Sequence, residues 1–164
     1  MLSEKLLHEM NEQVKHEMFS ANYYLSMAAY FNDKDLPGFA NFFRIQAQEE
    51  NMHAMKFFDF IDEVNGRVRI SALDEPQSDF ESVKDVIKLA LEHEQFVTKK
   101  IHQLMDIAVE EKNYPAISFL NWFVDEQVEE EATMQELLSK ILRVGDKGHV
   151  LYLLDKEMGS RQPE

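Results

Sequence analysis

Four polar residues interrupt stripes of apolar side chains that recur in this sequence at steps of three and four residues. That step is the period of the buried face of an amphipathic helix. The four interrupting residues are Glu17, Glu50, Glu94 and Gln127. Each lies about thirteen residues, or roughly 20 Å of helix, from the expected start of its helix. We therefore expect the four side chains to meet in one layer inside a helical bundle.

Two further residues, His53 and Glu130, extend this layer and give it an internal repeat. The six residues of the repeat are Glu17, Glu50, His53, Glu94, Gln127 and Glu130. In each half of the chain, the second and third members follow the first by 33 and 36 residues. Residues three apart are neighbours on one face of a helix. The repeat therefore predicts two matching helix pairs, in which one helix offers a carboxylate and the other offers two groups at positions i and i+3.

Metal binding is the chemistry that such a layer favours. Ionised carboxylates without partners cost several kcal/mol each in an apolar interior, and the stripes contain no lysine or arginine near the layer. Four carboxylates with one imidazole and one amide form a mainly oxygen donor set, which suits iron or manganese. Two ions about 3.5 to 4 Å apart can share a bridging carboxylate. A single buried glutamate or histidine is more often a hydrogen-bonded core residue, so the prediction depends on the joint pattern.

Helices are the elements expected to position the layer. The chain has 164 residues, 45% of them hydrophobic, with 5 glycines and 4 prolines, so we expect one all-α domain over residues 1–164. Pro37 suits a first helical turn, and Ser78 with Glu81 predicts a capping box. Asp146 is suited to cap a short fifth helix. The predicted helices cover residues 3–32, 35–66, 78–112, 113–145 and 147–158.

The connections between these helices predict the topology. Short segments join the first helix to the second and the third to the fourth, which makes two antiparallel pairs. Residues 67–77 form a connection long enough to return along the bundle, so the second and third helices are expected to run parallel. The predicted fold is a four-helix bundle with one long crossover and a short C-terminal helix.

Composition excludes several classes of function. The formal net charge of -14 argues against a nucleic-acid partner. The chain contains no cysteine, which excludes disulfides, thiol catalysis and iron–sulfur clusters. Its first residues lack the apolar run of a signal peptide, and no stretch has the length of a membrane span. We expect a soluble cytoplasmic protein without nucleic-acid or membrane partners.

The pattern also resembles a known family. The resemblance is carried by Glu17, Tyr24 and Glu94 and by the segments EENMH and DEQVEEE. Together they resemble the non-haem bacterial-type ferritins, over essentially the whole chain. The resemblance implies a ferroxidase that oxidises Fe(II) with dioxygen or peroxide. It also implies storage of Fe(III) mineral inside a homo-oligomeric cage of about 24 subunits.

The resemblance implies roles for the residues of the layer, which would hold two irons in each subunit. The first iron would be held by Glu17, Glu50 and His53. The second would share the bridging Glu50 with Glu94 and Glu130, and would have Gln127 beside it.

Two further assignments by resemblance have open alternatives. Tyr24 is similar to a tyrosine that hydrogen-bonds near the family's iron centre and supplies an electron, whereas a core tyrosine with a satisfied hydroxyl is an equal alternative. Glu49, Glu126 and Glu129 are similar to ligands of a third iron, whereas the same three residues also suit a solvated helix face.

Departures from related families give further expectations. Bacterioferritins carry a second ExxH motif and a haem-binding methionine where this chain has Gln127, Glu130 and Asn51, so we expect no haem. The alternative function is a cysteine-free di-iron peroxidase or oxygenase on the same bundle. A bundle without metal would leave the buried carboxylates unexplained. The apolar residues of the fifth helix pack either on their own bundle or, by resemblance, around a fourfold axis of the cage.

Overall fold

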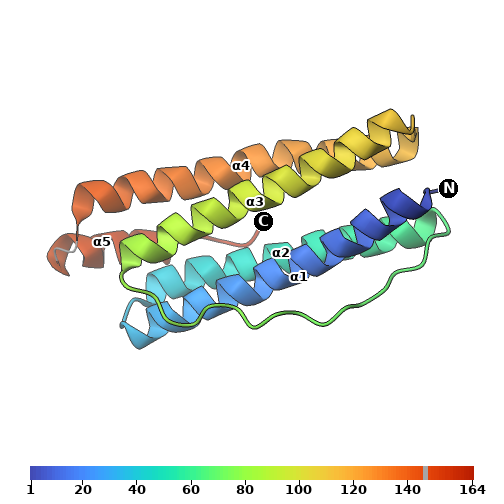
Figure 1. The fold of residues 1–164 in the computed structure, drawn as a ribbon. Coiled ribbons are helices and arrows are strands. Elements are labelled where there is room, and N and C mark those ends of the chain that lie inside the picture. Colours follow the sequence, from blue (N-terminus) through green and yellow to red (C-terminus); the bar gives the residue numbers. More distant parts are fainter. Residues whose placement is uncertain (146–147) are drawn as a thin grey trace.

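The computed structural model describes residues 1–145 and 148–164, and these residues form five helices (Figure 1). They are α1 (Glu4–Asp33), α2 (Pro37–Glu63), α3 (Val83–Glu110), α4 (Tyr114–Val144) and α5 (Gly148–Met158). α1 packs against α2 and α3 packs against α4, while α1 also contacts α3. The predicted four-helix bundle with a short fifth helix is confirmed. The predicted cap Asp146 lies outside the described residues.

Side-chain caps and tight turns define the two antiparallel pairs. The Ser3 hydroxyl accepts a hydrogen bond from the Leu6 amide at 3.0 Å at the start of α1. Asn113 Oδ1 accepts one from the Ala116 amide at 3.2 Å at the start of α4. Such caps satisfy amides that have no partner within the helix. Asp35 in the α1–α2 turn and Lys112 in the α3–α4 turn have φ angles of 55° and 53°. These positive angles allow the chain to reverse within a few residues.

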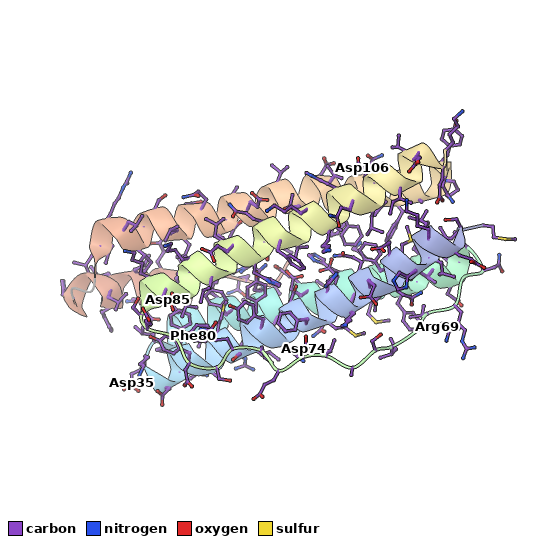
Figure 2. All side chains as sticks on the ribbon, viewed as in Figure 1. Asp35, Arg69, Asp74, Phe80, Asp85 and Asp106 are labelled. Carbon is purple, nitrogen blue, oxygen red and sulfur yellow. The ribbon has the colours of Figure 1, made fainter. Side chains whose placement is uncertain are left out.

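Residues 64–82 form the crossover, which runs along the length of the bundle beside α1 (Figure 1). Figure 2 marks Arg69 and Asp74 along this segment. Asn11 of α1 holds its first part, because its Nδ2 donates to the Arg67 carbonyl at 3.2 Å and its Oδ1 accepts from the Arg69 amide at 2.6 Å. The crossover returns the chain to the end at which α2 began, so α2 and α3 run parallel as predicted.

The start of α3 differs from the prediction. The capping box predicted at Ser78 and Glu81 is wrong, because α3 begins at Val83. The Ser82 hydroxyl accepts from the Asp85 amide at 3.1 Å, and the Asp85 carboxylate accepts from the Glu81 amide at 3.2 Å. The serine cap thus occurs four residues later than predicted, and the Asp85 carboxylate binds the amide of the residue before the cap, not that of the cap itself.

Contacts with α1 explain why the helix does not start earlier. The Ser26 hydroxyl donates to the Gln77 carbonyl at 2.6 Å. The Phe80 ring packs against Tyr30, with ring centroids 5.3 Å apart, and also against Tyr23. Phe80 lies where the crossover meets α3 (Figure 2). These contacts hold the last residues of the crossover on α1 in a non-helical conformation.

Two apolar clusters fill the bundle, one on each side of the polar layer. The cluster near the α1–α2 turn includes the fully buried Phe31, Phe39 and Phe43. The cluster near the opposite end includes Phe57 and Phe123. Burial of such a side chain contributes about 1.5–3 kcal/mol, so the two clusters fix the depth at which the polar residues lie. Within the described ranges, no helix is both long and apolar enough to cross a membrane.

α5 packs on the first turn of α2. Leu36, the N-cap residue of α2, makes no side-chain capping bond. Asp155 of α5 supplies one instead, because its Oδ1 accepts from the Phe39 amide at 2.9 Å. Leu154 and Met158 are buried, whereas Tyr152 is 64% exposed. One face of α5 therefore docks on its own bundle, and the other faces outward.

Gly38→Ala is expected to disrupt this docking. A Cβ atom at residue 38 would lie 1.6 Å from the Asp155 carbonyl oxygen, so α5 would have to move. We expect the free energy of unfolding to fall by about 1–3 kcal/mol, as for other overpacked sites, in a thermal or urea unfolding experiment. Gly148→Ala is the control, because a Cβ there meets nothing within 4 Å. Equal stability of the two variants would contradict the proposed docking contact.

Candidate metal centre

The structure brings all six residues of the polar layer together in the middle of the bundle. α1 supplies Glu17, α2 supplies Glu50 and His53, α3 supplies Glu94, and α4 supplies Gln127 and Glu130. Each residue is at most 5% exposed. Four helices that start far apart in the sequence therefore place acidic groups in one buried volume.

The first group of potential ligands joins α1 and α2. Ligand atoms of Glu17, Glu50 and His53 all lie within 4.8 Å of one another. His53 Nδ1 lies 3.9 Å from Glu17 Oε2 and 3.4 Å from Glu50 Oε2. One imidazole nitrogen and two carboxylates therefore face a common point.

The second group joins α2, α3 and α4. Ligand atoms of Glu50, Glu94 and Glu130 also lie within 4.8 Å of one another. Gln127 lies beside them, because its Nε2 donates to Glu94 Oε2 at 3.1 Å and to the Glu94 carbonyl at 3.2 Å. Glu50 belongs to both groups, so it is a candidate for a carboxylate shared between two cations. Two-metal sites hold their ions about 3.5–4 Å apart in this way.

Two atoms of the first group lack partners. Glu17 Oε2 and His53 Nδ1 are buried and have no hydrogen-bond partner among the described residues. Buried polar atoms are paired in the large majority of cases. An unpaired carboxylate oxygen within 3.9 Å of an unpaired imidazole nitrogen is the arrangement expected of ligands that face a cation.

The electrostatics of the layer also favour a cation. Burial raises the pKa of Glu17 well above its usual range, and the charge of Glu50 raises it further. Burial also raises the pKa of Glu50 well above its usual range, and the charges of Glu94 and Glu130 raise it further. The pKa of Glu130 rises to about 8, first through burial and then through Glu94. The protein's own groups thus leave these carboxylates poorly compensated, and bound cations would stabilise their ionised form.

Neutral donors around the carboxylates were not predicted as part of the site. Gln13 Nε2 donates to Glu17 Oε1 at 2.8 Å. Gln46 Nε2 donates to Glu130 Oε2 at 2.5 Å. Each glutamine stands four residues before a glutamate of the layer, at positions 17 and 50, and this i, i+4 spacing is the signal that could have identified them. Tyr24, which was predicted, donates its hydroxyl to Glu94 Oε1.

The three residues predicted for a third iron do not form a separate group. Glu49 is buried, and its Oε2 accepts from Arg161 at 2.8 Å while its Oε1 has no partner among the described residues. Glu126 instead joins His53 and Glu130 in a third group of potential ligands, whose atoms lie within 4.8 Å of one another, and its Oε1 lies 3.8 Å from His53 Nε2. Glu129 is exposed and belongs to none of the ligand groups found in the described part of the chain. A third iron site at these residues stays a prediction.

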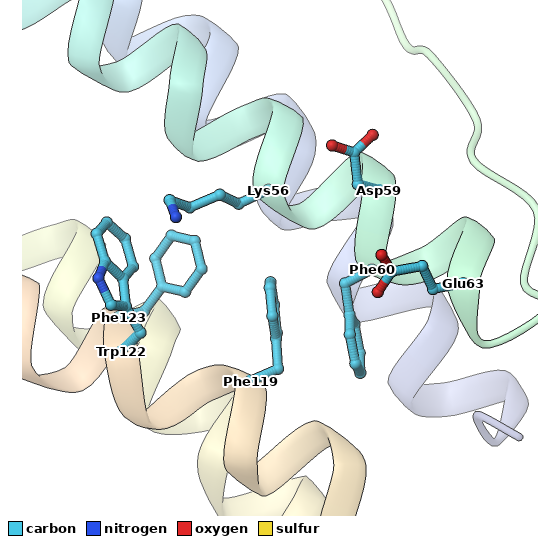
Figure 3. Close-up of a pocket in the computed structure, with 7 residues that line it drawn as sticks. All are labelled: Lys56, Asp59, Phe60, Glu63, Phe119, Trp122 and Phe123. Carbon is cyan, nitrogen blue, oxygen red and sulfur yellow. The ribbon is translucent and has the colours of Figure 1, made fainter.

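A hollow of about 210 Å³ lies between α2 and α4 beside the layer (Figure 3). Phe119, Trp122 and Phe123 line it, and Lys56 Nζ lies 4.3 Å from the centroid of the Trp122 ring. That ring centroid is 5.4 Å from the centroid of the His53 ring. Asp59 and Glu63 also line the hollow, so its lining carries charges of both signs. The groups of potential ligands lie in the buried layer next to it.

Comparisons with known proteins agree with this geometry. Residues 7–144 match the family described as Ferritin-like domain. A bacterial non-heme ferritin of Staphylococcus aureus (strain MRSA252) is 44% identical over 161 residues, which cover 98% of this chain and 97% of that protein. A solved open-pore ferritin from the archaeon Archaeoglobus fulgidus is 45% identical, with a TM-score of 0.97 over 99% of this chain and 100% of that chain. A humanized archaeal ferritin is 43% identical, with a TM-score of 0.97 over 99% of this chain and 98% of that chain. The chain therefore belongs to the ferritin family.

Proposed function

We propose that this chain is the ferroxidase subunit of an iron-storage protein. Fe(II) is its substrate, two ions bind in the buried layer, and Fe(III) is stored inside a homo-oligomeric shell. The observation that carries the proposal is the convergence of acidic groups from four helices around two buried atoms, Glu17 Oε2 and His53 Nδ1, that lack partners in the described chain. Membership of the ferritin family and the names of the bacterial relatives support it.

The residues of the layer divide between two iron positions. Glu17 and His53 hold the first ion, Glu94 and Glu130 hold the second, and Glu50 bridges them. Two bound Fe(II) ions supply one electron each to dioxygen or peroxide. The carboxylates assist because their negative charge stabilises Fe(III) more than Fe(II), which lowers the reduction potential of the bound iron. No haem enters this scheme.

Tyr24 and Gln127 support the second position. Tyr24 is fully buried, and its hydroxyl and the Gln127 amide both donate to the Glu94 carboxylate. They therefore orient the Glu94 oxygens without adding charge. Burial raises the pKa of Tyr24 well above its usual range, and Glu94 raises it further, so the phenol stays protonated. In this proposal Tyr24 also supplies an electron to the reaction.

Glu17→Gln should weaken iron binding while it raises the stability of the metal-free protein. The glutamine keeps the shape and the hydrogen bond from Gln13, but it removes the charge of a first-position ligand. We expect Fe(II) affinity and the rate of aerobic iron oxidation to fall at least about 100-fold, beyond the 10–100-fold typical of outer residues. The metal-free variant should melt at a higher temperature, because the raised pKa of buried Glu17 destabilises the parent at neutral pH and the glutamine does not titrate.

The control for this variant is Glu92→Gln, which removes an exposed carboxylate from α3. It should leave both the oxidation rate and the melting temperature close to those of the parent. Oxidation by Glu17→Gln at the parental rate, measured from absorbance during aerobic iron addition, would remove Glu17 from the proposed site.

The stability of the metal-free protein should depend on the protonation of Glu130. Its folded pKa of about 8 exceeds the ordinary value of 4.5, so its protonated form stabilises the fold at low pH, and this contribution is lost as pH rises from the ordinary value to the folded one. Relative to Glu130→Gln, the parent should lose up to ~1 kcal/mol per pH unit between pH 6 and 8, and the difference should level off at higher pH. Burial lowers the pKa of His93 to about 4, but this residue affects both proteins equally.

Parallel thermal melts of the parent and Glu130→Gln at several pH values test this prediction. A stability difference between the two proteins that stays constant from pH 6 to 8 would contradict it. Saturation with Fe(II) under anaerobic conditions should remove the decline in the parent, because bound iron keeps the carboxylate ionised across this range.

The proposed shell requires association of many copies. Val150, Tyr152 and Leu153 are exposed apolar residues of α5, which another copy can cover. A shell of about 24 chains of 19.3 kDa each should elute near ~460 kDa in size-exclusion chromatography and should retain iron added as Fe(II) in air. Elution as a monomer would favour a solitary di-iron enzyme over a storage protein.

A further inference from the structure

The C-terminal tail returns along α2 to the level of the metal centre. After α5, the chain runs back from one end of the bundle towards its middle (Figure 1). Arg161 lies in this tail, and its Cζ is 4.3 Å from the centroid of the Phe42 ring. Only 20% of the Arg161 side chain is exposed. The tail therefore brings a largely buried guanidinium to the helix that supplies Glu50 and His53.

The guanidinium binds two polar side chains of α2 at once. Arg161 Nη1 donates to Gln46 Oε1 at 2.9 Å, and Nη2 donates to Glu49 Oε2 at 2.8 Å. Nη1 also approaches the Phe42 carbonyl at 3.4 Å. A guanidinium is a rigid planar fork of donors, so these contacts fix the orientation of the Gln46 amide and the Glu49 carboxylate together.

The orientation of Gln46 matters because its other end faces the metal centre. Gln46 is fully buried, and its Nε2 donates to Glu130 Oε2 at 2.5 Å and approaches Glu50 Oε1 at 3.4 Å. The reverse orientation would place the amide oxygen against two carboxylates and the amide NH2 against the guanidinium. Both contacts would be repulsive, so Arg161 selects the orientation in which Gln46 donates to the centre.

We propose that Arg161 is a positioning residue for the metal centre, which acts through Gln46 to hold Glu50 and Glu130 where they receive cations. In this assignment Glu49 anchors the guanidinium. The inference rests on the proposed metal-binding function, but it adds a requirement that the ligands alone do not impose. The tail must be docked for the centre to bind metal with full affinity.

Co²⁺ titration of the intact oligomer tests this role without any oxidation step. Co²⁺ stands next to Fe²⁺ in the affinity order of divalent metals, and its binding is followed by visible absorption. Arg161→Gln should weaken Co²⁺ binding about tenfold, as typical for loss of an outer residue that orients a ligand. Arg161→Lys should restore part of the affinity, because it keeps the charge but not the fork. Arg44→Gln, an exposed residue of the same helix, controls for the change in net charge.

A double-mutant cycle separates positioning from a general contribution to folding. In a Gln46→Met background, Arg161→Gln should have little further effect on Co²⁺ affinity, because the residue through which it acts is already absent. An equal loss of affinity in both backgrounds would overturn the proposal. Parental affinity in Arg161→Gln would also overturn it.

Two other outcomes are distinguishable from these. If Arg161→Gln gains an additional bound Co²⁺ at unchanged affinity for the others, Arg161 competes with a cation at Glu49, and the positioning role is wrong. If the parent binds no Co²⁺ at all, the proposed metal centre fails together with this inference. Binding by the parent with no change in the variants refutes the inference alone.

Discussion

The proximity of four carboxylates in a dry interior is the constraint on which the rest of this bundle depends. Each is surrounded mainly by neutral donors, namely Gln13, Gln46, Gln127 and Tyr24. Neutral donors orient carboxylate oxygens without cancelling their charge, whereas a lysine or arginine inside the layer would occupy the place of a cation. The Arg161 guanidinium lies outside the layer and reaches it only through Gln46, to which it donates a hydrogen bond. The arrangement therefore orients the carboxylates without supplying a positive charge that would compensate them.

Such a layer is tolerable only because the apolar clusters on either side stabilise the bundle independently of it. The clusters contain aromatic residues from both antiparallel pairs, and they begin within a few residues of the ligands along every helix. Side chains in a close-packed interior have little freedom to move apart. The carboxylates consequently cannot relieve their repulsion by moving to solvent, and their pKa values rise instead.

The position of the layer was predictable from the sequence because a helix converts spacing along the chain directly into direction and depth. Glu17 and Glu94 could be placed at one level by counting residues, and the i, i+3 pairs followed from the same period. The start of α3 was misplaced because a second capping pair, Ser82 with Asp85, follows Ser78 within four residues. Tertiary contacts, not local propensity, decide between them. Arg161 was not predicted as part of the site at all, because an irregular tail has no period from which its path can be inferred.

The two nitrogens of His53 show how the outer carboxylates can serve the inner ones. Nδ1 must be unprotonated to act as a metal ligand, which places the proton of a neutral imidazole on Nε2. Glu126 Oε1 lies 3.8 Å from that nitrogen and its charge favours the proton there. In the proposed centre, Glu126 and Glu49 would have comparable tasks: Glu126 places a negative charge beside His53, and Glu49 anchors Arg161, which in turn orients Gln46.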